Sequence, residues 1–233
     1  KSGSAGGGTA TGPGTAVPFT LKEKPGTPRK GGAYNSYAHS FAGMGIQFLL
    51  FVALDFGIAF LLERRGGIWK RLRAAPLSRS SLLLGKAVSG ALVGLVSVGA
   101  TFAFGIVVLG IRVEGSVPGF VLLLLASALM ASSFGLLLAA LGKTPGATRG
   151  LAILAVLLLV MLGGGWVPAF VFPAWLQKVT LVLPTRWAID GLDAVTWRGA
   201  GLAAGALPAV AVLLGYTLLF LLVARLRFRW TDG

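Results

Sequence analysis

The sequence predicts an all-α integral membrane protein with five transmembrane helices, an external re-entrant or interfacial helical hairpin and a short cytoplasmic amphipathic helix. Three observations predict this class. The 233 residues are 55% apolar and only 12% charged, whereas a soluble domain devotes about a quarter of its residues to charge. The apolar residues gather in five runs, each long enough to cross the hydrocarbon core as a helix. The cations lie between these runs, which suits lipid headgroups better than nucleic acid.

The first 40 residues differ in composition from the rest of the chain. They contain nine glycines and the polar run LKEKPGTPRKGG, so they have too little apolar area to offset the entropy of ordering. We interpret 1–40 as a flexible extracytoplasmic tail and 41–233 as the transmembrane domain. The chain starts at Lys1 and shows no cleavable signal segment, so we expect a fragment or a processed chain.

Each apolar run is expected to be a helix, because only a helix satisfies its own backbone hydrogen bonds in lipid. The expected spans are 41–62, 82–110, 117–141, 151–172 and 203–224. The fourth span continues into a region, up to residue 199, that contains three consecutive glycines and several prolines. These residues interrupt a straight helix, and the apolar pieces between them are too short to cross. We therefore expect a re-entrant or interfacial hairpin on one membrane face.

The distribution of lysine and arginine predicts the topology. The loops at 63–81, 142–150 and 225–233 carry eleven of these residues. The opposite loops carry four, namely Arg112, Lys178, Arg186 and Arg198. Since cations near helix ends favour the cytoplasmic side, we expect a multi-pass protein of the cell (cytoplasmic or inner) membrane, with its C-terminus in the cytoplasm and its N-terminal tail outside.

The basic segment between the first two spans has two interpretations. It is either a topology signal or a docking element for a partner protein. On a helical wheel, Ile68 and Leu72 fall on one face, and Lys70 and Arg73 on the other. Pro76 ends this short amphipathic helix. A loop that only tethers two spans does not need such a helix, so the pattern favours docking.

Two sets of residues resemble a known family. The first set is Glu63-Arg64, Gly67, Trp69, Arg71-Leu72, Pro76 and Gly85-Lys86. The second set is Pro168, FPAWLQ at 172–177, Pro184-Thr185, Ala188, Asp190 and Ala194. In this order, and within this pattern of spans, the chain from about 35 to 230 resembles the permeases of type-2 ABC exporters. One departure is Ile68, where the family usually has threonine.

The resemblance implies a function and a set of functional residues. The chain would be a membrane-spanning permease subunit that moves an amphipathic or lipid-like substrate outward. The residues that couple it to a separate ATPase would be Glu63, Arg64, Gly67, Trp69, Lys70, Arg71 and Pro76. The external re-entrant gate would be Trp166, Pro168, Pro173, Trp175, Pro184 and Asp190. The family has six helices, so this chain would lack the first.

The expected partners follow from what the sequence lacks. The GKT at 142–144 is no phosphate-binding loop, because that pattern needs glycine where Leu137 stands. We therefore expect no enzymatic activity and no directly bound cofactor, with ATP-Mg held by a cytoplasmic ABC ATPase subunit. A second permease copy is also expected, because one subunit has little room for a large solute and the glycine pairs at 90/94 and 201/205 allow close packing. Membrane lipid is the remaining partner.

Few side chains offer other chemistry. His39 is the only histidine and there is no cysteine, so the sequence predicts no metal site. Asp190 and Asp193 could form a carboxylate pair, but the nearby Arg186 and Arg198 favour structural ion pairs. A membrane-embedded enzyme is accordingly disfavoured.

Asp55 lies inside the first span, where an aspartate costs roughly 2.5–3.5 kcal/mol at the helix centre. Two interpretations stay open. Asp55 lines a translocation path together with Gln47, or it hydrogen-bonds to a neighbouring helix, with Gln47 of a partner subunit as one candidate. The alternative function is a secondary transporter or channel that uses Asp55 as a proton or cation site.

Overall fold

The computed structural model describes residues 34–65 and 79–227, and all regular elements in these ranges are helical. Five of the described helices are long and apolar enough to cross a membrane, which confirms the predicted class and the number of spans. They are α1 (Ser36–Arg65), α3 (Arg79–Leu109), α4 (Val117–Leu141), α5 (Pro145–Leu162) and α8 (Leu207–Arg227), the last preceded by a π-helical turn at Leu202–Ala206. The predicted amphipathic helix at 67–75 lies outside the described residues.

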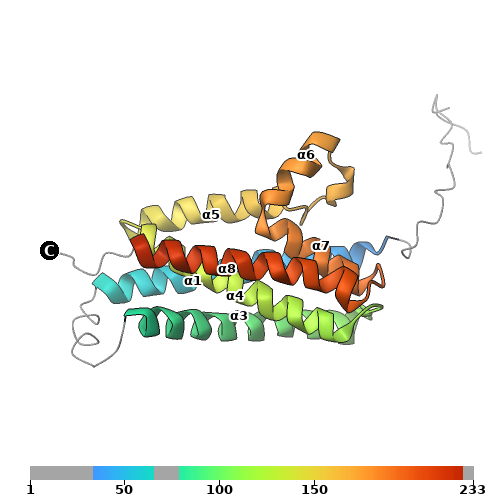
Figure 1. Cartoon of the computed structure of the whole chain (residues 1–233), viewed down its shortest axis with the longest axis horizontal. Coiled ribbons are helices and arrows are strands. Elements are labelled where there is room, and N and C mark those ends of the chain that lie inside the picture. The colour runs from blue at the N-terminus through green and yellow to red at the C-terminus, as the bar shows by residue number, and fades with distance from the viewer. Residues whose placement is uncertain (1–33, 66–78, 228–233) are drawn as a thin grey trace, which may run out of the picture.

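The five helices run roughly parallel or antiparallel in one bundle (Figure 1). One end of the bundle, which we call the basic end, holds the end of α1, the start of α3, the α4–α5 connection and the end of α8. The start of α1, the α3–α4 connection and residues 163–201 lie at the opposite end, which we call the far end.

Helix α4 forms the centre of the bundle. Two thirds of its most apolar window is buried, whereas less than a third is buried in α3, α5 and α8. A Cβ atom added to Gly57 of α1 would lie 2.3 Å from the carbonyl oxygen of Gly135, and one added to Gly135 would lie 2.2 Å from that of Ala53. Helices α1 and α4 therefore cross with their backbones in contact, which only glycine permits at these positions.

The glycine pair at 90/94 packs inside the chain. A Cβ on Gly90 would meet Ser132 of α4, and one on Gly94 would meet Leu49 of α1. These two glycines therefore allow α3 to pack closely against α4 and α1. Since they are covered within the chain, they do not support close packing with a second copy, and only the pair at 201/205 still does.

The fourth helix begins and ends earlier than the expected 151–172. It begins at Pro145 because the Thr144 side chain caps it, accepting a hydrogen bond from the backbone nitrogen of Ala147. It ends at Leu162 because glycines follow, and Gly164 takes a φ of +89° that other residues rarely adopt. The run of apolar residues continues past this point, which is why hydropathy alone extends the span.

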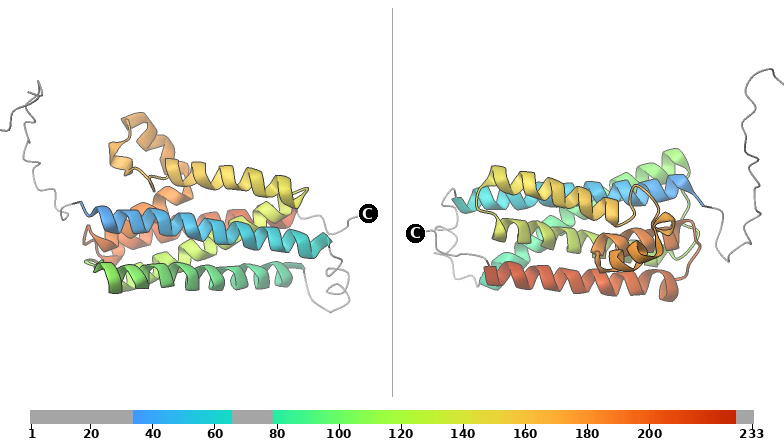
Figure 2. Two further views of the ribbon diagram at one scale, coloured as in Figure 1. Left: turned by 180° about the vertical axis from the view of Figure 1, so that it is seen from behind. Right: turned by 90° about the horizontal axis from the view of Figure 1, so that it is seen from above.

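Residues 163–200 form a separate excursion between α5 and α8. It contains the short turns η1 (Ala169–Val171) and η2 (Thr180–Val182), the six-residue α6 (Ala174–Val179) and the longer α7 (Pro184–Thr196). Figures 1 and 2 show α6 projecting sideways from the bundle, whereas α7 returns to pack against α1, α4 and α8. The interruption of the helix that the sequence predicts here is present, whereas the re-entrant or interfacial hairpin on one membrane face stays a prediction.

Candidate functional site

The segment with the predicted coupling role links the end of α1 to the start of α3, and both of these helix ends lie at the basic end. Most of that set, namely Gly67, Trp69, Lys70, Arg71, Pro76 and the side chain of Arg64, lies outside the described residues. Glu63 is described, and its carboxylate accepts a hydrogen bond from the Lys86 ammonium at 2.6 Å. The same ammonium lies 5.6 Å from the ring centroid of Phe60. These contacts tie α1 to α3 close to the residues that border the coupling segment.

The seam between α1 and α5 joins both residues of the predicted translocation path to partners in the same chain. Asp55 of α1 forms an ion pair with Arg149 of α5. Gln47 of α1 accepts a hydrogen bond at 2.7 Å from the indole nitrogen of Trp166, which follows α5. The structural interpretation of Asp55 expects a bond to a neighbouring helix, and Arg149 of α5 provides one within the chain. A contact between Asp55 and Gln47 of a second copy stays a prediction.

Beyond Trp166, a series of hydrogen bonds holds the 163–200 segment on the bundle. The Thr185 hydroxyl donates to the carbonyl of Leu159 at 2.5 Å, which fixes the start of α7 on the end of α5. Within the segment, the Trp187 indole donates to the carbonyl of Leu181 at 2.7 Å, which joins α7 to η2. The Tyr216 hydroxyl of α8 donates to the carbonyl of Val182. The segment is therefore attached on both of its sides.

The predicted gate residues take different positions in this segment. Pro168 precedes η1, Pro173 precedes α6, and Pro184 is the first residue of α7, so each proline stands where a helix begins. Trp175 of α6 is two-thirds exposed, and Trp166 is half exposed. An exposed tryptophan on a projecting helix is typical of contact with the membrane interface.

Asp190, the last of the predicted gate residues, lies in a cluster of charges formed by α7 and by Arg198, which follows it. Its carboxylate lies 2.9 Å from the Nε of Arg186 and 3.9 Å from a terminal nitrogen of Arg198, which also donates to the Asp190 carbonyl. Burial raises the pKa of the Asp190 carboxyl, while Arg186 and Arg198 act to lower it. The expectation of structural ion pairs is correct for Asp190.

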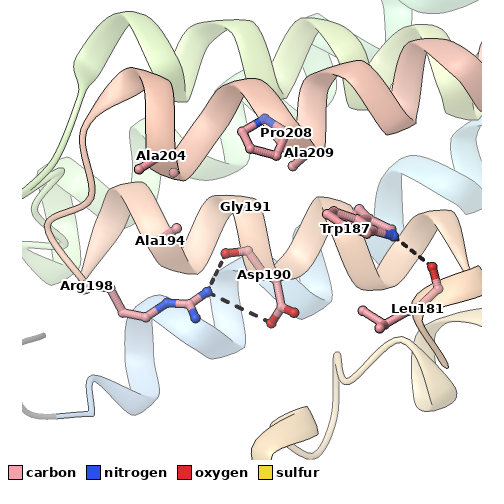
Figure 3. A pocket seen from close by; sticks show the side chains of 10 residues that line it. Leu181, Trp187, Asp190, Gly191, Ala194, Arg198, Ala204, Pro208 and Ala209 are labelled. Carbon is pink, nitrogen blue, oxygen red and sulfur yellow. Dashed lines mark hydrogen bonds and ion pairs between the residues drawn. The ribbon is translucent and has the colours of Figure 1, made fainter. Parts of the chain in front are cut away.

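A pocket of about 210 Å³ opens beside this cluster, between α7 and the start of α8 (Figure 3). The Asp190–Arg198 pair lies at one side of it, and Trp187 and Pro208 form apolar walls. Small residues line the remainder, namely Gly191, Ala194, Ala204, Gly205 and Ala209, together with Leu181. The pocket thus combines a charged edge with apolar walls.

Asp193 has a partner that sequence reasoning missed. Its carboxylate lies 2.7 Å from the Nδ1 of His39, and both residues are buried. The pair joins the first turns of α1 to α7 across 154 residues of sequence. The Nε2 of His39 and the second carboxylate oxygen of Asp193 are buried without a hydrogen-bond partner in the structure. The two aspartates of α7 therefore bind different partners and do not form a carboxylate pair.

No pattern in the sequence signals the His39–Asp193 pair. His39 has no acidic neighbour within a helical turn, and the only cue is that each is an ionisable residue at the edge of an apolar segment. Within residues 34–65 and 79–227, no group of three or more potential metal ligands comes together.

Comparisons with known proteins give one consistent family. The profile of the ABC-2 type transporter family matches residues 23–197. The inner membrane transport permease YhhJ of Escherichia coli is 32% identical over 178 residues, which are 76% of this chain and 47% of YhhJ. The linearmycin resistance permease protein LnrN of Bacillus subtilis is 26% identical over 184 residues, which are 79% of this chain and 48% of LnrN. The chain spans about half the length of these curated relatives.

Proposed function

The chain belongs to the ABC-2 type transporter family, and from that membership we propose that it is the permease subunit of an ATP-driven exporter. In this proposal residues 63–79 couple it to a separate cytoplasmic ABC ATPase, which binds ATP-Mg, and the substrate is an amphipathic or lipid-like molecule that moves outward. The resistance in the name of LnrN, which is 26% identical, suits outward transport.

The observation that carries the coupling proposal is the anchoring of the segment's borders. Helices α1 and α3 are joined by the Glu63–Lys86 ion pair, and Phe60, beside it, is fully buried. A force applied between these borders would be passed to two packed helices and not absorbed in a loose loop. A docking element for an ATPase needs this property, whereas a topology signal does not.

The orientation is also a proposal. The α4–α5 connection and the end of α8 carry the described cations Lys143, Arg225 and Arg227, and both lie at the basic end with the end of α1 and the start of α3. The sequence that links α1 to α3 is also rich in cations. If the basic end is cytoplasmic, the 163–200 segment lies on the outside, where it would act as a gate. A second permease copy would complete the pore.

The alternative of a secondary transporter has less support. A proton or cation site at Asp55 requires a carboxylate that can release its counter-ion during each cycle. Asp55 already has the fixed cation of Arg149 beside it. This pairing favours a role in holding α1 to α5, or in meeting the substrate, over a role as a proton carrier.

Co-purification tests the coupling proposal. The chain is purified from its native membranes by an affinity tag, and ATPase activity in the eluate is measured. We expect activity with the wild-type chain and its loss in Lys70→Glu/Arg71→Glu, because a charge reversal turns docking contacts repulsive. The matched control is Lys22→Glu/Lys24→Glu, the same change of charge in the N-terminal tail. Equal ATPase activity for both double variants would remove the coupling role from residues 63–79.

A further inference from the structure

The Asp55–Arg149 pair lies on the surface of the bundle at membrane depth. Asp55 is eight residues before the end of the 28-residue span of α1, or about 12 Å along the helix axis. If that span is centred on a hydrocarbon core of about 30 Å, Asp55 lies about 6 Å inside it. Yet the two side chains are 61% and 55% exposed. Ionised groups facing lipid are costly, so something polar is expected to meet them.

The pair keeps free hydrogen-bonding capacity on its open side. Among the described residues, the bond uses one terminal nitrogen of Arg149 and one oxygen of Asp55. A guanidinium has five N–H donors and a carboxylate has two acceptor oxygens. Further donors and one acceptor oxygen thus remain for a ligand that carries an anion and a cation side by side.

An apolar track leads away from the pair along α1. Phe48 and Met44 lie seven and eleven residues before Asp55, which puts all three side chains on one face of the helix. Both apolar side chains are about half exposed or more. The track from Asp55 to Met44 is about 16 Å long, which matches an alkyl chain of about twelve carbons. Near Met44, at the end of the track away from Asp55, the Gln47–Trp166 hydrogen bond joins α1 to the residues that follow α5.

We propose that the α1–α5 seam binds an amphiphile with a zwitterionic headgroup. The anionic group of the headgroup contacts Arg149, its cationic group contacts Asp55, and its alkyl chain lies along Phe48 and Met44. The inference rests on the proposed function only in naming its class of substrate. Binding at the seam requires neither the ATPase nor transport, so the two can fail independently.

A fluorescence titration tests the inference on the purified chain in neutral maltoside micelles. A bimane label is attached to Ala59→Cys, an exposed position one turn from Asp55 in a chain without other cysteines. Three probes share a dodecyl chain: dodecylphosphocholine is zwitterionic, dodecyl phosphate is anionic and dodecyltrimethylammonium is cationic. Free phosphocholine has the same headgroup without an alkyl chain. Its affinity relative to dodecylphosphocholine shows whether the site binds the headgroup alone or the whole amphiphile.

We expect saturable binding with about a fivefold preference for dodecylphosphocholine, the upper range for one exposed charge contact. Asp55→Asn should shift the preference to dodecyl phosphate, and Arg149→Gln should shift it to dodecyltrimethylammonium. Glu63→Gln, which breaks the Glu63–Lys86 ion pair of α1, is the matched control and should leave the preference unchanged. Thermal melting of each variant verifies folding.

Three results would overturn the proposal. The first is an unchanged order of the three probes in both Asp55→Asn and Arg149→Gln, which would leave the pair a purely structural contact. The second is equal binding of free phosphocholine and dodecylphosphocholine, which would remove the apolar track. The third is a bimane signal that follows protein concentration and not probe concentration, which would show that a second copy covers the seam.

Discussion

The crossing of α1 and α4 gives a prediction whose size follows from the structure. In Gly57→Ala, the new methyl carbon would lie 2.3 Å from the carbonyl oxygen of Gly135, whereas ordinary contact begins at 3.4 Å. The two helices must therefore separate by about 1 Å at this point, since neither backbone can rotate away. Separation loosens the contacts of the buried Leu50 and Leu54 beside the crossing. Overpacking of this kind costs about 1–3 kcal/mol.

The assay is thermal unfolding of the purified chain in detergent, followed by tryptophan fluorescence. For a chain of this length, the expected cost lowers the melting temperature by about 3–10 °C. Gly99→Ala in α3 is the matched control, because a Cβ there has nothing within 4 Å. Alanine has the higher helix propensity, so this control should melt at the wild-type temperature or above. Equal melting temperatures for Gly57→Ala and Gly99→Ala would refute a backbone contact between α1 and α4.

Three further predictions concern the far end, the topology and the assembly. His39→Ala should lower the free energy of unfolding by about 3–5 kcal/mol, because it leaves the buried Asp193 carboxylate unpaired, and the melting temperature should fall. A melting temperature equal to that of the wild-type chain would show that the pair does not stabilise the fold. In intact cells, an impermeant thiol reagent should label Ser4→Cys but not Thr231→Cys, and the reverse pattern would invert the topology. Chemical crosslinking in native membranes should yield a dimer of the chain. Detection of the monomer alone would count against a pore of two copies.

The number and type of the membrane helices could be predicted from the sequence, because hydropathy and run length decide both. Helix ends depend on local hydrogen bonds instead. Thr144 caps α5, which begins at Pro145, six residues before the expected start at 151. The glycines after Leu162 end the helix, although the apolar run continues. Hydropathy measures burial in lipid and is insensitive to such caps.

The pairing of side chains could not be predicted from one sequence. Asp55 and Arg149 are 94 residues apart, and His39 and Asp193 are 154 residues apart. Their contacts depend on which helices are neighbours and on how each helix is rotated, and neither property is encoded locally. Gly90 and Gly94 show the same limit, since a small-residue pattern predicts close packing but not the identity of the packed partner.

The most direct test of the exporter proposal is transport into inverted membrane vesicles, in which outward export appears as uptake. The probe is a fluorescent lysophosphatidylcholine, and vesicles with the wild-type chain are compared with those carrying Lys70→Glu/Arg71→Glu at equal expression. An ATP-driven exporter predicts uptake that requires ATP, persists when the proton gradient is collapsed and is lost in the double variant. Uptake that needs only the proton gradient and is unaffected by the double variant would contradict the account and favour a secondary transporter.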